Sequence, residues 1–173
     1  PGKWLETALA KDMRLGYDPW LHGKSEIDRL DNSAKRVGAT LVPLEPNPLD
    51  ATWEDQPDPP QGAVVIQPED LAGESAASRR ARIGALVGEA GADCAMLTQP
   101  DSLAWLLNIR GSDLIRLPVA LGFAVIAVDG AVTLYMEPAK LDGAVLAHLG
   151  NEVTVAPPVR LAQDLAGFAG RAV

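Results

Sequence analysis

The sequence predicts an α/β fold in which helices flank a mixed sheet, preceded by a partial α/β unit. Short apolar runs of strand length alternate with segments of helical periodicity, which is the pattern of a sheet covered by helices. One Asp-Gly pair, at positions 129 and 130, indicates an antiparallel hairpin within that sheet. The chain has 173 residues, 47% of them hydrophobic, so it is long enough for one complete domain and part of another.

The first third of the chain predicts three helices and two strands. Asp18 and Pro19 favour a helix start, because an aspartate can accept hydrogen bonds from the free N–H groups of the first turn and proline needs no partner there. Gly38 favours the end of that helix. The expected helices are residues 4–11, 18–37 and 47–53, and the expected strands are 13–17 and 40–44.

A proline-rich acidic segment divides the chain. Residues 54–60 contain three prolines and three acids in seven positions, which favours a stiff, solvated spacer. We therefore expect a C-terminal part of one domain at 1–56, a linker at 57–62 and a second domain at 63–173. The first of these is too short to bury a core of its own.

The second domain is expected to alternate helices with strands. The helix at 75–90 is amphipathic, with Ile83, Leu86 and Val87 facing inward, and with Arg79, Arg80 and Arg82 facing outward. Asp101 or Ser102 is expected to cap the next helix, and Asp129-Gly130 suits a type I′ turn. The expected strands are 63–66, 93–98, 119–128, 132–136 and 153–155, and the expected helices are 75–90, 101–107, 138–149 and 159–168.

Composition excludes several classes of partner. The formal net charge of -8, without a basic stripe, argues against nucleic acid. The sequence contains no apolar run long enough to cross a membrane, and its first residues do not resemble a signal peptide, so a cytoplasmic protein is expected. Cys94 is the single cysteine and is expected to be a buried small residue. Because Pro1 is not an initiator, the natural N-terminus is expected upstream.

Catalytic groups are scarce in this sequence. Its two histidines, His22 and His148, have better structural than catalytic interpretations, and no set of His, Asp and Glu has metal-ligand spacing. We therefore expect no catalytic residue and no metal ligand in this segment. The spatial neighbours of both histidines stay open at this point.

Residues 108–113 combine an amide, a guanidinium, a glycine, a hydroxyl and a carboxylate. Asn108, Arg110 and Asp113 are candidate substrate-binding residues, since Arg110 suits a carboxylate or peptide carbonyl and Asp113 could fix Arg110 or receive an amine. The alternative is a turn that satisfies itself, with Asp113 and Ser112 bonding local N–H groups. The tryptophans at 20, 53 and 105 are expected to be core or domain-interface anchors.

Five motifs together resemble the amino-terminal region of three-domain Xaa-Pro aminopeptidases, which belong to the creatinase/prolidase-like metallopeptidases. The sharpest motif is Trp105-Leu-Leu-Asn-Ile-Arg-Gly-Ser-Asp113. The others are the runs at 16–22, 47–53, 73–75 and 98–102. The resemblance implies the end of a first creatinase-like domain followed by a second one, with the creatinase-like amino-terminal domain fold.

The resemblance also implies a function for the parent protein. It would be a cytoplasmic aminopeptidase that cleaves the bond before a proline in the second position of a peptide. Two divalent metal ions, commonly manganese, would be held by two Asp, one His and two Glu of a later catalytic domain.

The segment itself would be inactive alone. It would shape the substrate cleft, with Asn108, Arg110 and Asp113 at the rim, and would contact the catalytic domain and a second subunit of a homodimer. The alternative is a protein-interaction module whose parent has no peptidase activity. A small metal-free hydrolase is disfavoured because the chain has so few catalytic groups.

Overall fold

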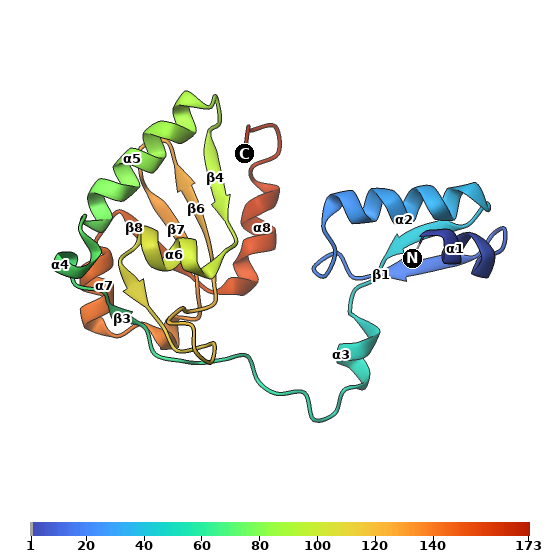
Figure 1. The fold of residues 1–173 in the computed structure, drawn as a ribbon, viewed down its shortest axis with the longest axis horizontal. Helices are drawn as coiled ribbons and strands as arrows, with labels where there is room; N and C mark the ends of the chain where they lie inside the picture. Colours follow the sequence, from blue (N-terminus) through green and yellow to red (C-terminus); the bar gives the residue numbers. More distant parts are fainter. Residues whose placement is uncertain (1) are drawn as a thin grey trace. The chain divides into compact units, whose positions relative to one another are not determined.

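The computed structural model describes residues 2–173, which form two compact units. One unit ends at Asp58 and the other runs from Pro59 to Val173 (Figure 1). None of the helices within the described range is long and apolar enough to cross a membrane.

The first unit contains one parallel pair of strands joined by a helix. The elements are α1 (Gly2–Ala8), β1 (Arg14–Tyr17), α2 (Lys24–Arg36), β2 (Thr40–Pro43) and α3 (Pro48–Thr52). Leu15 of β1 lies opposite Leu41 of β2 in the parallel register. In the part of this unit that the structure describes, the buried hydrophobic residues are Leu5, Ala34 and Ala39. The core of the unit is therefore thin, as expected for so short a segment.

The predicted helix start at Asp18-Pro19 is wrong. Helix α2 begins at Lys24, and the preceding Gly23 makes no side-chain cap. One oxygen of the Asp18 carboxylate accepts a hydrogen bond from the Trp20 N–H at 2.7 Å, and the other accepts one from Asn47 Nδ2 at 2.8 Å. An aspartate that can cap a helix can also close a turn two residues on, and here the turn prevails because Asn47 holds the second oxygen.

The second unit is built on a four-stranded mixed sheet in the order β4-β6-β7-β8. β4 and β6 are antiparallel, as are β6 and β7, whereas β7 and β8 are parallel. A separate antiparallel pair joins β3 to β5. The strands are β3 (Val65–Ile66), β4 (Cys94–Leu97), β5 (Ile109–Arg110), β6 (Phe123–Ala127), β7 (Val132–Tyr135) and β8 (Val153–Ala156). The predicted mixed α/β architecture is confirmed.

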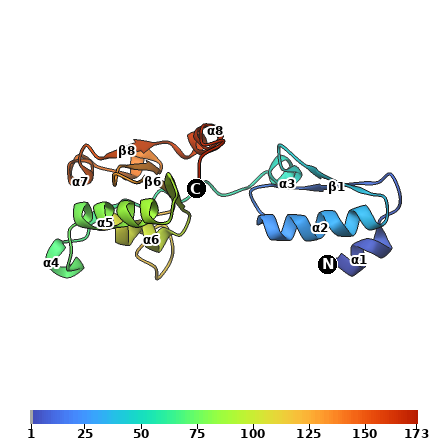
Figure 2. The same ribbon diagram turned by 90° about the horizontal axis from the view of Figure 1, so that it is seen from above.

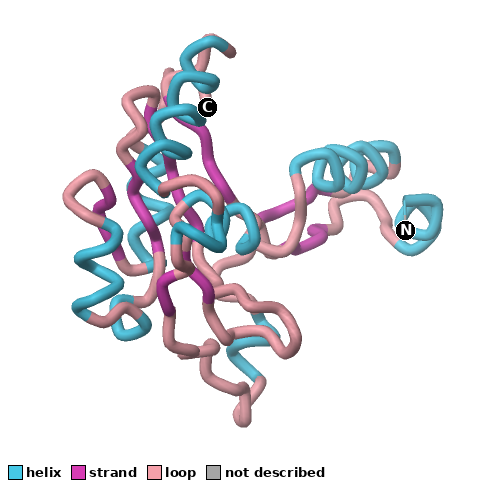
Figure 3. The backbone as a smooth tube through the Cα atoms, turned by 60° about the vertical axis from the view of Figure 1, so that its left-hand side comes forward, coloured by secondary structure: helices cyan, strands magenta, loops and turns pink. Residues whose placement is uncertain are grey.

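Helices cover both faces of this sheet (Figures 2 and 3). They are α4 (Glu69–Ala72), α5 (Ala76–Glu89), α6 (Pro100–Leu106), α7 (Gly143–Leu149) and α8 (Leu161–Ala166), with short 3-10 turns η1 (Pro138–Lys140) and η2 (Pro158–Arg160). Ala124, Ile126 and Leu134 face the larger core with α5, α6 and α7. Val125 and Tyr135 face the smaller core with α8. The alternation follows from the two-residue period of a strand.

The prediction that the arginines of α5 face outward is partly wrong. Arg79 and Arg80 are only 5% and 7% exposed, whereas Leu86, predicted to face inward, is 50% exposed. Arg80 Nη1 donates to the carbonyl of Leu149 at the end of α7, at 3.3 Å. Guanidinium groups are buried here because they serve carbonyls of neighbouring helices, a role that helical periodicity does not reveal.

The β6–β7 hairpin was predicted correctly, but its turn was not. Gly130 has φ of 84°, whereas Asp129 does not have a positive φ, so this is not a type I′ turn. Ala127 and Ala131 are hydrogen-bonded across the turn, which leaves a three-residue loop. A three-residue loop needs one left-handed residue, and Gly130 supplies it.

Other elements differ from the prediction at their ends. The expected strand at 119–128 begins only at Phe123, and the expected helix at 138–149 is split into η1 and α7. Asp142 caps α7 by accepting a hydrogen bond from the Val145 N–H at 2.8 Å. Helix α6 begins at Pro100 without a side-chain cap, so neither Asp101 nor Ser102 caps it.

Trp20, Trp53 and Trp105 are 64%, 51% and 41% exposed, so none of them is a core anchor.

Gly84 is required where α5 crosses the β6–β7 turn. A Cβ atom there would lie 2.7 Å from the Gly130 nitrogen and 2.8 Å from the Val128 oxygen, both backbone atoms. We expect Gly84→Ala to lower the free energy of unfolding by about 2 kcal/mol, since overpacking outweighs the gain in helix propensity. Chemical denaturation followed by circular dichroism measures the change.

Gly88→Ala is the matched control in the same helix. A Cβ atom at Gly88 would meet Val128 at 3.7 Å, an ordinary contact. Gly88→Ala should raise the free energy of unfolding by about 0.5 kcal/mol. Equal effects of the two substitutions would contradict the close approach at Gly84.

Candidate recognition site

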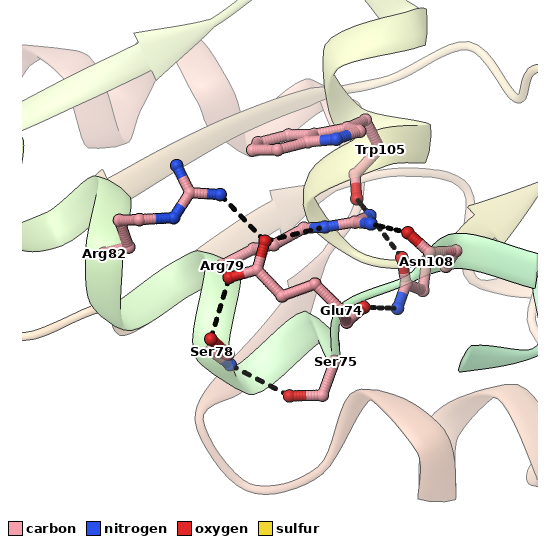
Figure 4. A network of polar contacts seen from close by, with 8 residues as sticks. Glu74, Ser75, Ser78, Arg79, Arg82, Trp105 and Asn108 are labelled. Atoms are coloured by element: carbon pink, nitrogen blue, oxygen red, sulfur yellow. Dashed lines mark hydrogen bonds and ion pairs between the residues drawn. The ribbon is translucent and has the colours of Figure 1, made fainter. Parts of the chain in front are cut away.

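Arg79 is the centre of a buried polar network (Figure 4). Its Nη1 atom donates to the Trp105 carbonyl at 2.6 Å and also to Asn108 Oδ1, and its Nη2 atom donates to the Ala72 carbonyl. The guanidinium carbon lies 4.8 Å from the centre of the Trp105 ring, a cation–π arrangement. One arginine of α5 therefore joins the end of α4, the end of α6 and the start of β5.

Glu74 completes this network from the residue before the α5 cap. Its carboxylate accepts hydrogen bonds from Arg82 Nη2 at 2.8 Å and from Ser78 Oγ at 2.7 Å. These two bonds lower the pKa of Glu74 to about 2, and the bond from Arg82 has the larger effect. Arg79 Nε lies 3.5 Å from Glu74 Oε2, an ion-pair distance without hydrogen-bond geometry. Glu74 is thus ionised and holds two arginines of α5.

Asn108 is buried and fully engaged. Its Nδ2 atom donates to the Glu74 carbonyl at 2.8 Å, and its own carbonyl accepts the Gln67 N–H at 2.8 Å. Its backbone is left-handed, with φ of 49°, a conformation that asparagine tolerates better than most residues. Asn108 therefore sets the direction in which the chain leaves α6.

Arg110 is half-buried and is only partly engaged. Its Nη1 atom donates to the carbonyls of Ala104 at 3.1 Å and Ile109 at 2.8 Å. Within residues 2–173, Nε and Nη2 of Arg110 have no hydrogen-bond partner. The Arg110 guanidinium forms no ion pair with Asp113, which pairs with Lys140 instead. The arrangement in which Asp113 fixes Arg110 is therefore not found.

Asp113 forms a buried ion pair with Lys140. The two side chains are 0% and 4% exposed, and Lys140 Nζ lies 2.6 Å from Asp113 Oδ2. The carboxylate also accepts the Gly62 N–H at 2.9 Å and the Leu121 N–H at 2.6 Å. Burial alone would raise the pKa of Asp113, but the bonds from Lys140, Leu121 and Gly62 together hold it below its usual value.

A cavity of about 480 Å³ lies beside this ion pair. Its size lies within the range of pockets that hold small ligands. It is formed where β4, β7 and β8 end and β6 begins, together with the segment that precedes Gly62. The lining residues are Pro59, Pro60, Gln61, Thr98, Pro100, Leu121, Gly122, Phe123, Glu137, Lys140, Pro157, Pro158 and Val159.

A metal centre does not fit the residues described. Among positions 2–173, no three His, Cys, Asp or Glu side chains come close enough together to hold an ion. His22 lies 3.2 Å from Glu26, and His148 Nε2 lies 2.9 Å from the Leu107 carbonyl. Cys94 is buried and free, as expected. No step of metal-dependent hydrolysis is therefore assigned to these side chains.

The structure brings Asp113 together with residues that the sequence did not place near it. Lys140, Gly62 and Leu121 gave no signal in the sequence, since none of them stands in a recognisable motif. Glu74 belongs to the motif at 73–75 and Arg79 follows it, but Arg79 was assigned to the surface. The signal that could have found this network is an acid, Glu74, just before a helix start, followed by Arg79 and Arg82, which lie three residues apart on one face of the helix.

Comparison with known proteins gives consistent similarities. A family model described as the creatinase/prolidase N-terminal domain matches residues 55–172. The chain is 32% identical to a probable Xaa-Pro aminopeptidase P of Fusarium vanettenii over 158 residues, which is 90% of this chain and 25% of that protein. It is also 32% identical to aminopeptidase P1 of Lotus japonicus, over 84% of this chain and 22% of that protein.

The fold is also found in solved structures. The X-prolyl aminopeptidase of Caenorhabditis elegans, described as a cytosolic enzyme with a di-nuclear active site, superposes with a TM-score of 0.88. It is 24% identical, and the match covers 97% of this chain and 27% of that one. The chain thus spans about a quarter of the length of the proteins that it resembles.

Asp113→Asn should strongly destabilise the second unit. It leaves the Lys140 ammonium buried without a counter-charge, which costs about 3 kcal/mol of unfolding free energy. Urea denaturation at neutral pH measures the loss. Asp70→Asn, at an exposed aspartate of the same unit, is the control and should change little.

The same ion pair makes stability depend on pH. The folded pKa of Asp113 lies below the unfolded value of about 3.9. Its contribution is therefore complete above that value and is lost as the pH falls toward the folded pKa. Denaturation at a series of pH values should show a fall in stability below about pH 4 that is smaller in Asp113→Asn. An identical fall in both proteins would contradict this role.

Arg79→Lys should destabilise the fold although it keeps the positive charge. One ammonium cannot reach the carbonyls of Trp105 and Ala72 and the amide of Asn108 together, because only the planar guanidinium presents several donors in one fork. We expect a loss of about 2 kcal/mol of unfolding free energy in thermal or urea denaturation. Arg82→Lys, at a half-exposed ion pair, is the matched control, and a comparable loss there would contradict the special role of Arg79.

Proposed function

The chain belongs to the creatinase/prolidase N-terminal domain family, and we propose that it is the non-catalytic amino-terminal segment of a metal-dependent Xaa-Pro aminopeptidase. The observation that carries this proposal is the similarity to aminopeptidase P proteins along 84–90% of this chain. The parent would hydrolyse the peptide bond that precedes a proline in the second position.

The division of labour in the parent follows from the residues available. The described side chains offer no cluster that fits a metal. We propose that two divalent ions, manganese in the proposal, are held by the catalytic domain of the parent. We assign residues 1–56 to the end of a first creatinase-like domain, 57–62 to a linker and 63–173 to a second such domain. The parent is proposed to be cytoplasmic and to form a homodimer.

Asn108, Arg110 and Asp113 are proposed to serve the substrate cleft in different ways. Arg110 would contact the peptide, because its Nε and Nη2 atoms are without partners inside the described chain and suit a carbonyl or carboxylate. Asn108 and Asp113 would act as positioning residues, since their side chains are occupied by Arg79 and Lys140. They fix the backbone on either side of Arg110.

A protein-interaction module without peptidase activity is the second candidate. It is favoured by the exposed apolar side chains of Ile115 and Leu117, which are 92% and 56% exposed. Reading the coding sequence beyond Val173 separates the two functions. Two Asp, one His and two Glu at the spacing of a metallopeptidase support the aminopeptidase, and their replacement or absence supports the module.

Arg110→Ala in the full-length enzyme tests the proposed contact. We expect KM for an Xaa-Pro peptide to rise about tenfold, because a charge-assisted hydrogen bond is lost, while the stability of the fold changes little. Steady-state hydrolysis of a fluorogenic Xaa-Pro peptide measures both KM and kcat.

Arg171→Ala is the control in the same unit and should leave both constants unchanged, since it removes an exposed arginine far along the chain from the 108–113 segment. If Arg110→Ala also left KM and kcat unchanged, Arg110 would have no role in substrate binding.

A further inference from the structure

The proline-rich segment at the start of the second unit is held by very few contacts. Residues 59–61 are exposed and lie along one wall of the cavity beside Lys140. Within the part of the chain that the structure describes, residues 57–61 make no hydrogen bond and no ion pair. Three of these five residues are prolines, which have no N–H group to donate. We call residues 59–62 the strap.

Gly62 is the point at which the strap is fastened. Its N–H donates to Asp113 Oδ1 at 2.9 Å. A Cβ atom at Gly62 would lie 2.6 Å from Ser112 Oγ, 2.9 Å from the Ser112 carbonyl carbon and 3.0 Å from the Asp113 nitrogen, so this close approach requires glycine. The next fastened residue is Val64, which is buried and whose N–H donates to the Lys140 carbonyl at 2.9 Å. Among the described residues, the strap therefore has one polar fastening ahead of Val64.

The two oxygens of the Asp113 carboxylate hold different segments. Oδ1 accepts the Gly62 N–H, whereas Oδ2 accepts Lys140 Nζ and the Leu121 N–H, both at 2.6 Å. Loss of the bond to Gly62 therefore leaves the bonds to Lys140 and Leu121 in place. The buried ion pair does not have to break for the strap to leave.

We propose that the strap is a releasable part of the fold, and that the hydrogen bond from Gly62 to Asp113 is the latch that holds it closed. In the closed state the linker is unfastened over residues 57–61. In the open state the unfastened segment extends to Ala63, which adds two residues and at most about 7 Å to its reach. Asp113 thus sets the length of the linker, besides holding the backbone beside Arg110.

The opening of the strap is a local event. It breaks one charge-assisted hydrogen bond and exposes little apolar surface, because the strap residues 59–61 are already exposed. Release of Val64 would instead take a buried side chain out of the core. Segments with few buried contacts open far more often than the whole domain unfolds. The latch lies within this chain, so the proposal stands or falls independently of the activity of the parent.

Amide hydrogen exchange of the 173-residue chain, followed by NMR, is the test. After correction for intrinsic rates, we expect the Gly62 N–H to exchange about thirtyfold more slowly than the Gln61 N–H, because only Gly62 is hydrogen-bonded. It should exchange at least about tenfold faster than the Val64 N–H, because the strap opens alone. Low concentrations of urea should leave the Gly62 rate unchanged and raise the Val64 rate, since local opening exposes little surface.

Gly62→Ala should hold the strap open. The N–H at position 62 should then exchange within about threefold of the Gln61 N–H. The Leu121 N–H should stay within about threefold of its original rate, because it is bonded to the other oxygen of Asp113. Gly143→Ala is the matched control, since a Cβ atom at Gly143 meets nothing within 4 Å, and it should change neither rate.

Three results would overturn the proposal. If the Gly62 N–H exchanges as fast as the Gln61 N–H in the original chain, there is no latch. If it exchanges as slowly as the Val64 N–H and with the same dependence on urea, the strap opens only with the rest of the unit. If Gly62→Ala removes protection at Leu121 as well, the strap and the ion pair are inseparable. Should this variant be unfolded by circular dichroism, the rates in the original chain still decide the matter.

Discussion

The second unit depends on one buried carboxylate. Asp113 accepts hydrogen bonds from Gly62, Leu121 and Lys140, which lie in three different segments of the chain. Its pair with Lys140 is almost entirely shielded from water. Removing either charge would leave the other without a partner in a medium that solvates it poorly. The Asp113 carboxylate therefore fixes three segments relative to one another: the start of the unit, the loop after β5 and the turn after β7.

A second polar network, centred on Arg79, holds the N-terminal end of the 108–113 segment. Arg79 bonds Asn108, Trp105 and Ala72, and Glu74 holds both Arg79 and Arg82. Between the two networks lies Arg110, whose guanidinium is only partly used. In this arrangement buried residues hold the backbone on both sides of Arg110, and the guanidinium of Arg110 is half-buried. Preorganisation of this kind lowers the entropy lost on binding.

The described part of the chain offers polar networks that hold its backbone and no cluster of metal-ligating side chains. Nothing within residues 2–173 forms a metal cluster, while the family to which the chain belongs is that of the creatinase/prolidase N-terminal domain. A domain of this kind can contribute shape, charge and contacts to an active site without contributing a reacting group. The cavity lies where strands of the sheet end, an edge at which loops rather than regular elements decide the surface.

The sequence by itself determined the class of fold, the sites of most helices and strands, and the family, because these follow from local periodicity and from contiguous motifs. Ile83 and Val87 facing the core, the β6–β7 hairpin and the buried Cys94 are examples. Only the tertiary structure decided where the charged side chains go. Asp18 closes a turn because Asn47 is near it, and Arg79 is buried because three acceptors converge on it. The partner of Asp113 is Lys140, which lies 27 residues away in the chain, and no local pattern encodes a pairing at that separation.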